Sequence, residues 1–155
     1  MADFSYLTDD EYRSVYSRVP RLCVDLALVD GNGLLLSKRD IPPFQGLWHF
    51  PGGRVYHNET VAEAAARIAD AELGITIALE AFAGYIEIPN EGTFTHSVSL
   101  VFFGKRVGGE VRGSRQAQEA RTWKELPEDT LPAQKDFLKR HWEEVVGRMG
   151  YTKAE

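Results

Sequence analysis

Alternation of apolar and polar positions divides most of the chain into strands and turns. Residues 21–30 alternate in part and are rich in aliphatic side chains, which predicts a strand. Residues 30–33 read Asp-Gly-Asn-Gly, a strong hairpin turn that returns the chain as a second strand over 34–39. The same reasoning predicts strands over 75–88 (one or two strands, with Gly84 as a bulge or break), 95–107 and 119–125.

Three other stretches carry the signals of helices. Thr8 and Glu11 form a capping-box pattern that opens a short helix ending before Pro20. Residues 60–73 are rich in alanine, and Gly74 follows at the position of a left-handed C-cap. A third, amphipathic helix is predicted over 132–148. The predicted inward side chains are Tyr12, Val15, Tyr16 and Val19 in the first helix and Phe137, Leu138, Trp142, Val145 and Val146 in the last.

Strands interleaved with helices predict an α/β fold in which a mixed sheet lies between helices. The length of 155 residues and the 43% hydrophobic content fit one domain over 1–155, with 1–20 as a helical extension and 151–155 as a loose tail. The first helix would pack on its own core or on a second subunit, and a homodimer is therefore one expectation that the sequence leaves open.

Charge and cysteine content narrow the expected partners and location. A formal charge of −5 argues against a nucleic-acid backbone as the main partner. The single cysteine, Cys23, lies in an apolar run and is predicted to be a buried thiol, which is compatible with a reducing cytoplasm. Acidic residues interrupt any signal peptide at the start, and no stretch is long enough for a membrane span, so no membrane partner is expected.

The most informative stretch runs from residue 47 to residue 75. It predicts a short apolar strand, a tight turn at Gly52 and Gly53, a polar loop and then the alanine-rich helix. Because the two glycines lack side chains, the backbone there can turn sharply and approach a ligand closely. The turn brings a carbonyl to the place where the helix brings the carboxylate of Glu72, a plausible cradle for a divalent cation and its phosphates.

This stretch resembles the Nudix box, G-x5-E-x7-R-E-U-x-E-E-x-G-U, where U is aliphatic. Pro51 and Gly52 precede the pattern in the usual way, and the matching positions are Gly53, Glu59, Arg67, Ala69, Glu72, Gly74 and Ile75. The resemblance implies the Nudix α/β/α sandwich. Two positions depart from it, since Ile68 and Ala71 stand where the family has glutamate. On a regular helix, positions 68, 71 and 72 share one face, so Glu72 alone would supply a carboxylate there.

Beyond the box, the core from about Arg21 to Trp142 is similar to the GDP-mannose mannosyl hydrolases. That subfamily also has a reduced box, with Arg-Val after Pro-Gly-Gly and Ala-Glu-Leu-Gly at the helix end. The matching positions here are Asp25, Lys38, Arg39, Arg54, Val55, 71–74, Thr95 and His96. The resemblance implies hydrolysis of a nucleoside diphosphate sugar at its glycosidic C–O bond with one Mg²⁺, which Mn²⁺ could replace. It further implies that the cation is held by the Gly52 carbonyl, Glu72 and a residue of a late loop.

The resemblance also suggests roles for the basic residues and for Asp25. Arg39, Arg54 and Arg67 would contact the phosphates or the leaving group, for which the paired N–H groups of guanidinium are suited. Asp25 would bind the nucleoside. Simpler interpretations stay open: Arg67 could brace the loop by pairing with Glu59, and Asp25 could face the surface.

The subfamily's general base is a histidine in a Gln-His pair before the last strand, and this pair is not found here. Alignment on Trp123 without a gap places Ala117 and Gln118 at those positions, whereas a slip of one residue makes Gln118 a metal ligand and Glu119 the base. His96 is a second candidate base. His49, His57 and His141 are interpreted as structural or solvated, Trp48 and Phe50 as core, and Phe44 or Tyr56 as residues that could stack on a ring.

Three functions therefore compete. The first is Mg²⁺-dependent cleavage of the glycosidic C–O bond of a nucleotide sugar, as in the GDP-mannose enzymes. The second is cleavage of a P–O bond in the diphosphate, as in nucleotide-sugar or ADP-ribose diphosphatases. The third is a reduced Nudix domain that binds a nucleotide without turnover, because two box carboxylates and an obvious base are missing.

Overall fold

The computed structural model describes residues 7–90, 93–112 and 119–150. Its strands are β1 (Arg21–Asp30), β2 (Gly33–Lys38), β3 (Trp48–His49), β4 (Gly52–Arg54), β5 (Ile75–Ile88), β6 (Ser97–Gly109) and β7 (Glu119–Trp123). Its helices are α1 (Asp9–Tyr16), α2 (Val61–Ile68), a π-helical turn η1 (Ala69–Leu73) and α3 (Pro132–Arg148). The predicted tail over 151–155 lies outside the described residues.

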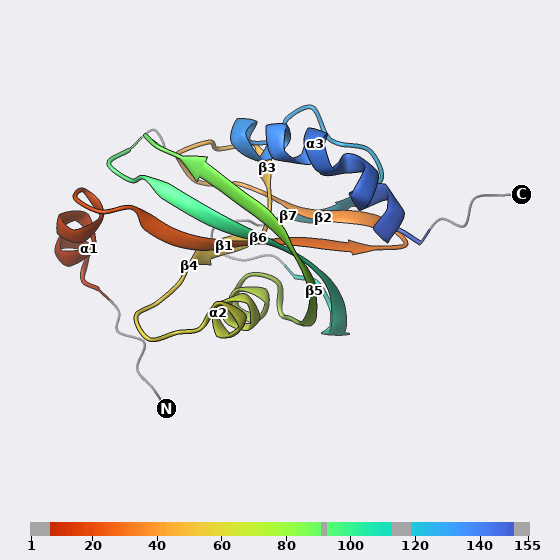
Figure 1. Cartoon of the computed structure of the whole chain (residues 1–155), viewed down its shortest axis with the longest axis horizontal. Helices are drawn as coiled ribbons and strands as arrows, with labels where there is room; N and C mark the ends of the chain where they lie inside the picture. Colours follow the sequence, from red (N-terminus) through yellow and green to blue (C-terminus); the bar gives the residue numbers. More distant parts are fainter. Residues whose placement is uncertain (1–6, 91–92, 113–118, 151–155) are drawn as a thin grey trace, which may run out of the picture.

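The seven strands form one mixed sheet (Figure 1). Its main order is β3-β2-β1-β6-β5, with β4 paired to β1 and β7 paired to β2. Among the paired strands of the described residues, only β1 and β6 run parallel, from Arg21↔Ser97 to Leu28↔Gly104. The predicted α/β class with a mixed sheet is therefore confirmed.

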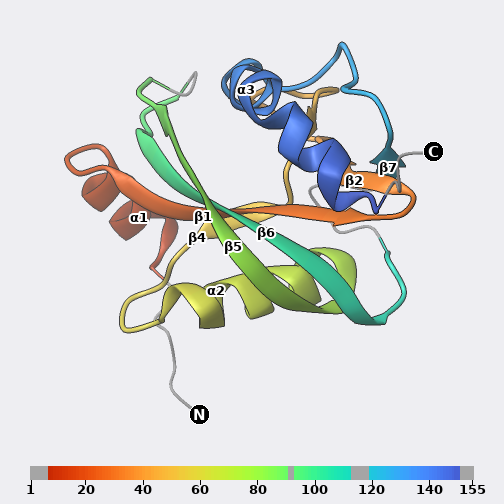
Figure 2. The ribbon, with the colours of Figure 1, turned by 45° about the vertical axis from the view of Figure 1, so that its right-hand side comes forward.

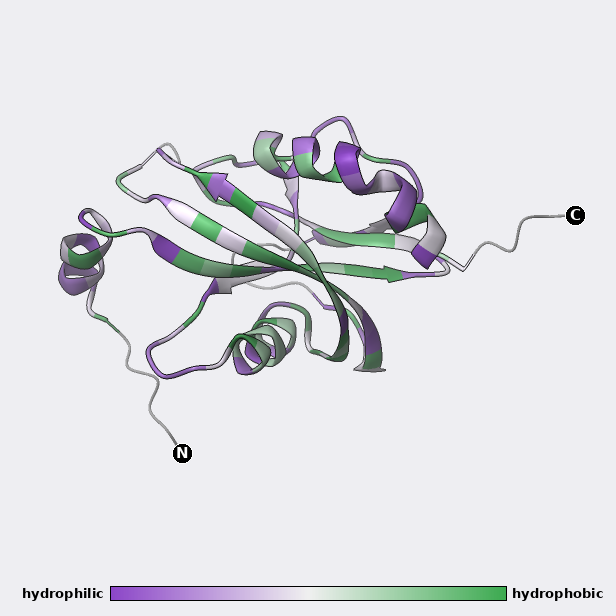
Figure 3. Cartoon of the chain, in the orientation of Figure 1, coloured by the Kyte–Doolittle hydropathy of each residue, from purple (hydrophilic) through white to green (hydrophobic). Residues whose placement is uncertain are grey.

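The helices α2 and α3 cover opposite faces of the sheet, which Figures 1 and 2 show from two directions. Each face has its own apolar core. Phe50, Phe103 and Phe137 belong to the core under α3, and Leu26, Ile68 and Leu73 to the core under α2 and η1. Apolar colouring gathers on the strands between the two helices in Figure 3, whereas the turns are largely hydrophilic. No helix among the described residues is both long and apolar enough to cross a bilayer.

Several local predictions are confirmed. Thr8 and Glu11 exchange both capping-box hydrogen bonds at the start of α1. Gly74 ends η1 with φ of 67°, the left-handed C-cap that the sequence predicts. Gly84 has φ of 138° beside a register shift in the β5–β6 ladder, and Cys23 is buried.

Two predictions are met only in part. On the predicted apolar face of the first helix, Tyr12 and Tyr16 are half-buried, whereas Val15 is 41% and Val19 48% exposed. The predicted helix over 60–73 does not continue as a regular α-helix, because its last five residues form η1. Of the three positions expected to share one face, Ile68 and Glu72 both reach the Gly52–Gly53 turn, whereas Ala71 is exposed.

Candidate active site

A cleft of about 340 Å³ lies against the first half of β1. Arg21, Cys23 and Asp25 line it from alternate positions of this strand, which places them on one face of the sheet. Ser97 and Ser99 of β6 continue the same floor, because their Cα positions pair with those of Arg21 and Cys23. The cleft also reaches the Gly52–Gly53 turn, the loop after β2, the turn between β5 and β6, and the start of α3.

Two carboxylates meet the backbone at Gly52. Asp25 pairs with Gly52 between β1 and β4, and a Cβ atom added at Gly52 would overlap the Oδ1 atom of Asp25. The Gly52 N–H donates to the Oε2 atom of Glu72 at 3.3 Å. Glycine is therefore needed at this position, and the sequence prediction that Glu72 and Gly52 converge is supported by this contact.

The π-helical turn helps to explain how Glu72 reaches the cleft. Ile68 ends α2 inside the core, where it faces Gly53: a Cβ added at Gly53 would lie 3.5 Å from the Cγ1 atom of Ile68. The wider turn of η1 follows, and Glu72 lies on it beside the glycine turn. Single π-turns of this kind are frequent at functional sites.

Burial is the main influence on the ionisation of Glu72. It raises the pKa of this carboxyl from 4.5 to about 7, against the hydrogen bond from Gly52, and the negative charge of Asp25 raises it further. The charges of Arg39 and Arg67 act in the opposite direction. Two carboxylates held together in this way repel each other at neutral pH, and a bound cation would remove that repulsion.

The donor set at Gly52 suits a hard divalent cation. The carboxylates of Asp25 and Glu72 and the Gly52 carbonyl are oxygen donors, the kind that Mg²⁺ prefers. No group of three or more His, Cys, Asp or Glu side chains gathers anywhere in the described ranges, so the protein's share of the ligands is small. Gln118, the other predicted ligand, lies outside the described residues.

Arg39 lines the cleft, and a loop holds its guanidinium group in place. Its side chain donates to the backbone oxygens of Pro43 and Pro42, the second at 3.4 Å. The loop that receives these bonds also contributes Phe44, with φ of 64°, to the lining. Arg39 is thus positioned where its charge acts on Glu72, and its contact with a phosphate stays a prediction.

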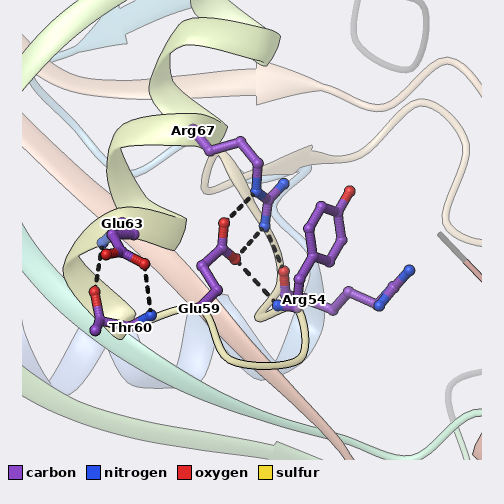
Figure 4. A network of polar contacts seen from close by, with 6 residues as sticks. Arg54, Glu59, Thr60, Glu63 and Arg67 are labelled. Carbon is purple, nitrogen blue, oxygen red and sulfur yellow. Dashed lines mark hydrogen bonds and ion pairs between the residues drawn. The ribbon is translucent and has the colours of Figure 1, made fainter. Parts of the chain in front are cut away.

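Arg67 and Arg54 occupy a different place from Arg39. Figure 4 shows Arg67 bridging Glu59 and the backbone of Arg54. Arg67 donates to the two Glu59 oxygens at 2.7 and 2.9 Å and to the Arg54 carbonyl at 2.8 Å. The Arg67 hydrogen bond is the main cause that holds the pKa of Glu59 below its ordinary value. This geometry matches the bracing interpretation of Arg67, and a direct contact with substrate stays a prediction.

The Arg54 guanidinium lies over the Tyr56 ring, 4.5 Å from its centroid, and near the Tyr12 ring at 5.6 Å. Neither Arg54 nor Arg67 is among the residues that line the cleft. Substrate contact by Arg54 therefore also stays a prediction.

The predicted general bases do not line the cleft either. Glu119 begins β7 opposite Lys38, one residue before Arg39, and its side chain is exposed. His96 is half-buried, and its backbone oxygen accepts from the Arg21 N–H. The pairing of β7 with β2 brings Glu119 close to the residue before Arg39, but its side chain is not among those that line the cleft.

Several lining residues were not assigned to the site from the sequence, among them His49, Gln134, Tyr12 and Phe94. His49 donates from Nδ1 to the Phe50 oxygen at 2.6 Å, which leaves Nε2 as an acceptor, and burial lowers the pKa of its ring. Gln134 accepts from the Phe50 N–H at 2.7 Å and donates to Asp25 at 3.5 Å. This residue of α3 therefore contacts both the chain that leads into the glycine turn and Asp25 on β1. Only the position of His49 next to Phe-Pro-Gly-Gly gave a signal in the sequence.

Comparisons with known proteins agree with this architecture. The family described as NUDIX domain matches residues 19–145. A low-salt glycan biosynthesis protein, Agl8, of Haloferax volcanii is 40% identical over 81 residues, 52% of this chain and 52% of that protein. An ADP-ribose pyrophosphatase of Methanocaldococcus jannaschii is 35% identical over 101 residues, 65% of this chain and 60% of that protein. The chain thus spans between half and two thirds of the length of these relatives.

Solved structures show the same fold. A NUDIX hydrolase from Nitrosomonas europaea superposes with a TM-score of 0.71 at 27% identity, covering 81% of this chain and 71% of that one. A MutT NUDIX hydrolase from Burkholderia pseudomallei gives 0.69 at 28% identity, covering 78% and 97%. The predicted sandwich of helices around a mixed sheet is confirmed by these matches.

Proposed function

Since this chain belongs to the NUDIX family, we propose that it hydrolyses a nucleoside diphosphate sugar in a Mg²⁺-dependent reaction, with attack at the glycosidic carbon. The observation that carries this proposal is the meeting of Asp25, Gly52 and Glu72 at one end of a cleft that Arg39 also lines. This arrangement provides oxygen donors for a cation and a guanidinium group for phosphate oxygens within one cavity. The glycan-related name of the Haloferax relative supports a sugar-bearing substrate.

The scarcity of carboxylates favours one cation over two. Two box positions that carry glutamate in the family have apolar residues here. Ile68 lies in the core and Ala71 is exposed, and neither side chain can be a metal ligand. Mg²⁺ bound at Gly52 would neutralise charge on the diphosphate and improve it as a leaving group. Water attack on carbon does not require a second metal to generate the nucleophile, which is why C–O cleavage is the first choice.

The residues then divide the work as follows. Glu72 and the Gly52 carbonyl would hold the cation. Asp25, which the resemblance assigned to the nucleoside, lies beside them and is proposed here as a further cation ligand instead. Gln134 would fix Asp25 and the chain at Phe50, which leads into the glycine turn. Arg39 contacts the diphosphate and stabilises the charge that develops as the bond to the sugar breaks. A general base takes a proton from the attacking water, whose oxygen bonds to the anomeric carbon, so that nucleoside diphosphate and free sugar are released.

Glu119 is the proposed base. The start of β7, where it lies, is opposite the residue that precedes Arg39, so a carboxylate is available next to the cleft. Gln118, just before it, is proposed as the additional cation ligand.

The second candidate function is cleavage of a P–O bond of the diphosphate. The similarity to a protein named ADP-ribose pyrophosphatase, 35% identical over 101 residues, favours this alternative. The same cation and arginine would serve both reactions, and the difference lies in which atom the water attacks.

Hydrolysis of GDP-mannose, UDP-glucose and ADP-ribose with Mg²⁺ in ¹⁸O-labelled water decides between the functions. We expect the label on the sugar, whereas label on phosphate would establish the diphosphatase. Binding of these nucleotides without any Mg²⁺-dependent product would instead indicate a binding domain. In the same assay we expect Glu119→Gln to lose most of its turnover while Glu125→Gln, an exposed control, keeps it. Unchanged turnover of Glu119→Gln would remove Glu119 as the base.

A further inference from the structure

The cleft has two chemically different ends. Its two carboxylates, Asp25 and Glu72, lie at the Gly52 turn. Arg21, four residues before Asp25 on the same strand, lies at the other end, where Tyr12 and Phe94 also line the cavity. At about 3.3 Å per strand residue, the two ends are about 13 Å apart along β1. A nucleoside diphosphate has a similar extended length.

Tyr12 is held firmly against the floor of the cleft. Its hydroxyl oxygen accepts a hydrogen bond of 2.6 Å from the Nη1 atom of Arg21. Arg21 also donates from Nε and Nη2 to the Ser97 hydroxyl at 3.1 and 2.8 Å. The Tyr12 ring is therefore fixed to β1 and β6 before any ligand arrives.

Phe94 completes an aromatic wall from the turn between β5 and β6. Its ring meets the Tyr12 ring edge-on, with centroids 6.0 Å apart and an interplanar angle of 81°. The Arg13 guanidinium lies 4.5 Å from the Phe94 centroid, which further limits the orientation of the ring. The neighbouring hydroxyls of Thr93 and Thr95 bond to each other at 3.1 Å. This end thus offers aromatic surface rather than carboxylates.

The helix that carries Tyr12 contributes little to the core. No residue of α1 is buried, and its exposed Val15 shows that the apolar face does not hold it to the sheet. Figure 2 shows α1 beside the start of β1, outside the layers formed by α2 and α3. It also lies outside residues 19–145, over which the chain matches the family.

We propose that α1 and Phe94 form the nucleobase-binding end of the cleft, with the rings of Tyr12 and Phe94 packing against the base. This proposal rests on the proposed function, which places the diphosphate at Gly52. Aromatic rings suit a base because every base has a π-face. The two carboxylates proposed to bind the cation lie at the other end of the cleft. The helix α1 is then a specificity element.

Calorimetric titration of the full chain with Mg²⁺ and either GDP, ADP, UDP or inorganic pyrophosphate tests this proposal. We expect Tyr12→Ala and Phe94→Ala each to weaken the preferred nucleoside diphosphate about tenfold and to leave pyrophosphate affinity within twofold. Tyr12→Phe, which keeps the ring, and Val15→Ala, at an exposed position of α1 outside the cleft lining, serve as matched controls and should stay within twofold. Phe94→Ala keeps the test valid if Tyr12→Ala detaches α1.

Three results would overturn the proposal. Both alanine variants could keep full nucleoside diphosphate affinity, or they could lose pyrophosphate affinity equally. They could also weaken only the sugar-bearing nucleotide and not the nucleoside diphosphate, which would assign this end to the sugar. Wild-type protein that binds neither pyrophosphate nor any of the three nucleotides would contradict the proposed function itself.

Discussion

Glu72 combines two properties that oppose each other in a folded protein. It is placed where burial and the charge of Asp25 raise its pKa to about 7, and it lies within hydrogen-bond distance of the Gly52 turn. A carboxylate in such a place is unfavourable for the cation-free fold when it is ionised. This cost is expected where a residue is kept for binding rather than for stability.

Replacement of Glu72 by glutamine should therefore stabilise the cation-free protein, and only at higher pH. A pKa raised above the ordinary 4.5 means that the stability from Glu72 is present below pH 4.5 and is lost as pH rises through about 7. We expect Glu72→Gln to be more stable than wild type by up to about 3 kcal/mol at pH 8 and nearly equal at pH 5. Urea unfolding in EDTA at both pH values measures this, and a Glu72→Gln variant less stable at pH 8 would refute the raised pKa.

At the level of elements, the loop between β4 and α2 depends on a buried ion pair. Glu59 receives two hydrogen bonds from Arg67 and one from the Tyr56 N–H at 3.0 Å, while its side chain is only 1% exposed. The Arg67 guanidinium also lies over the Tyr56 ring, 3.7 Å from its centroid, which further ties Arg67 to the loop. These bonds tie the loop that follows the glycine turn to α2, so Arg67 influences the site through position.

Arg67→Ala should consequently destabilise the fold, because it leaves the Glu59 charge buried without its cation. We expect a loss of about 2 to 3 kcal/mol at pH 7, less than for a fully buried pair, since the Arg67 side chain is 27% exposed. The pKa of Glu59 is lowered by Arg67, so the stability from Glu59 exists above its ordinary pKa and the difference between variant and wild type should shrink in acid. Thermal unfolding at pH 7 and pH 4 measures both effects.

The exposed pair of Glu128 and Lys135 supplies the control. Its hydrogen bond of 3.1 Å joins a Glu128 side chain that is 94% exposed, so Glu128→Gln should leave the stability close to that of wild type. Equal effects of Arg67→Ala and Glu128→Gln would mean that the Arg67 bridge does not hold the loop.

Local sequence signals predicted most elements, because their causes are local. The Asp-Gly-Asn-Gly turn defines the β1–β2 hairpin, and α3 begins and ends where its apolar period and Pro132 indicate. The π-turn at residues 69–73 was missed, since a period of 3.6 was assumed up to Gly74. The meeting of Glu72 with Gly52 was anticipated from the order of strand, glycine turn and helix, and the family pattern added to it.

The rest of the cleft could not be predicted in this way. Gln134 is separated from Asp25 by 109 positions, and only the packing of α3 across the sheet brings them together. Tyr12 was assigned to the apolar face of the first helix, and no local pattern indicates that its hydroxyl accepts a hydrogen bond from Arg21 at the cleft. Contacts of this kind depend on the arrangement of whole elements, which the apolar pattern of each element does not encode.

On the scale of the whole molecule, the site must overcome unfavourable charge. The chain carries a formal charge of −5, and its cleft contains two carboxylates, yet the proposed ligand is an anion. Favourable interaction must then arise locally, from a cation between Asp25 and Glu72 and from Arg39. Binding of an anionic ligand in this cleft therefore depends on one cation bound at the Gly52 turn.

Titration of Mn²⁺ followed by electron paramagnetic resonance, in the presence of saturating GDP, tests this claim most directly. We predict one Mn²⁺ bound per chain in addition to the metal that free GDP takes up, and its loss in Glu72→Gln, while the exposed control Glu125→Gln keeps it. Two bound ions per chain, or one ion whose affinity is unchanged in Glu72→Gln, would contradict a single cation site formed by Glu72 at the Gly52 turn.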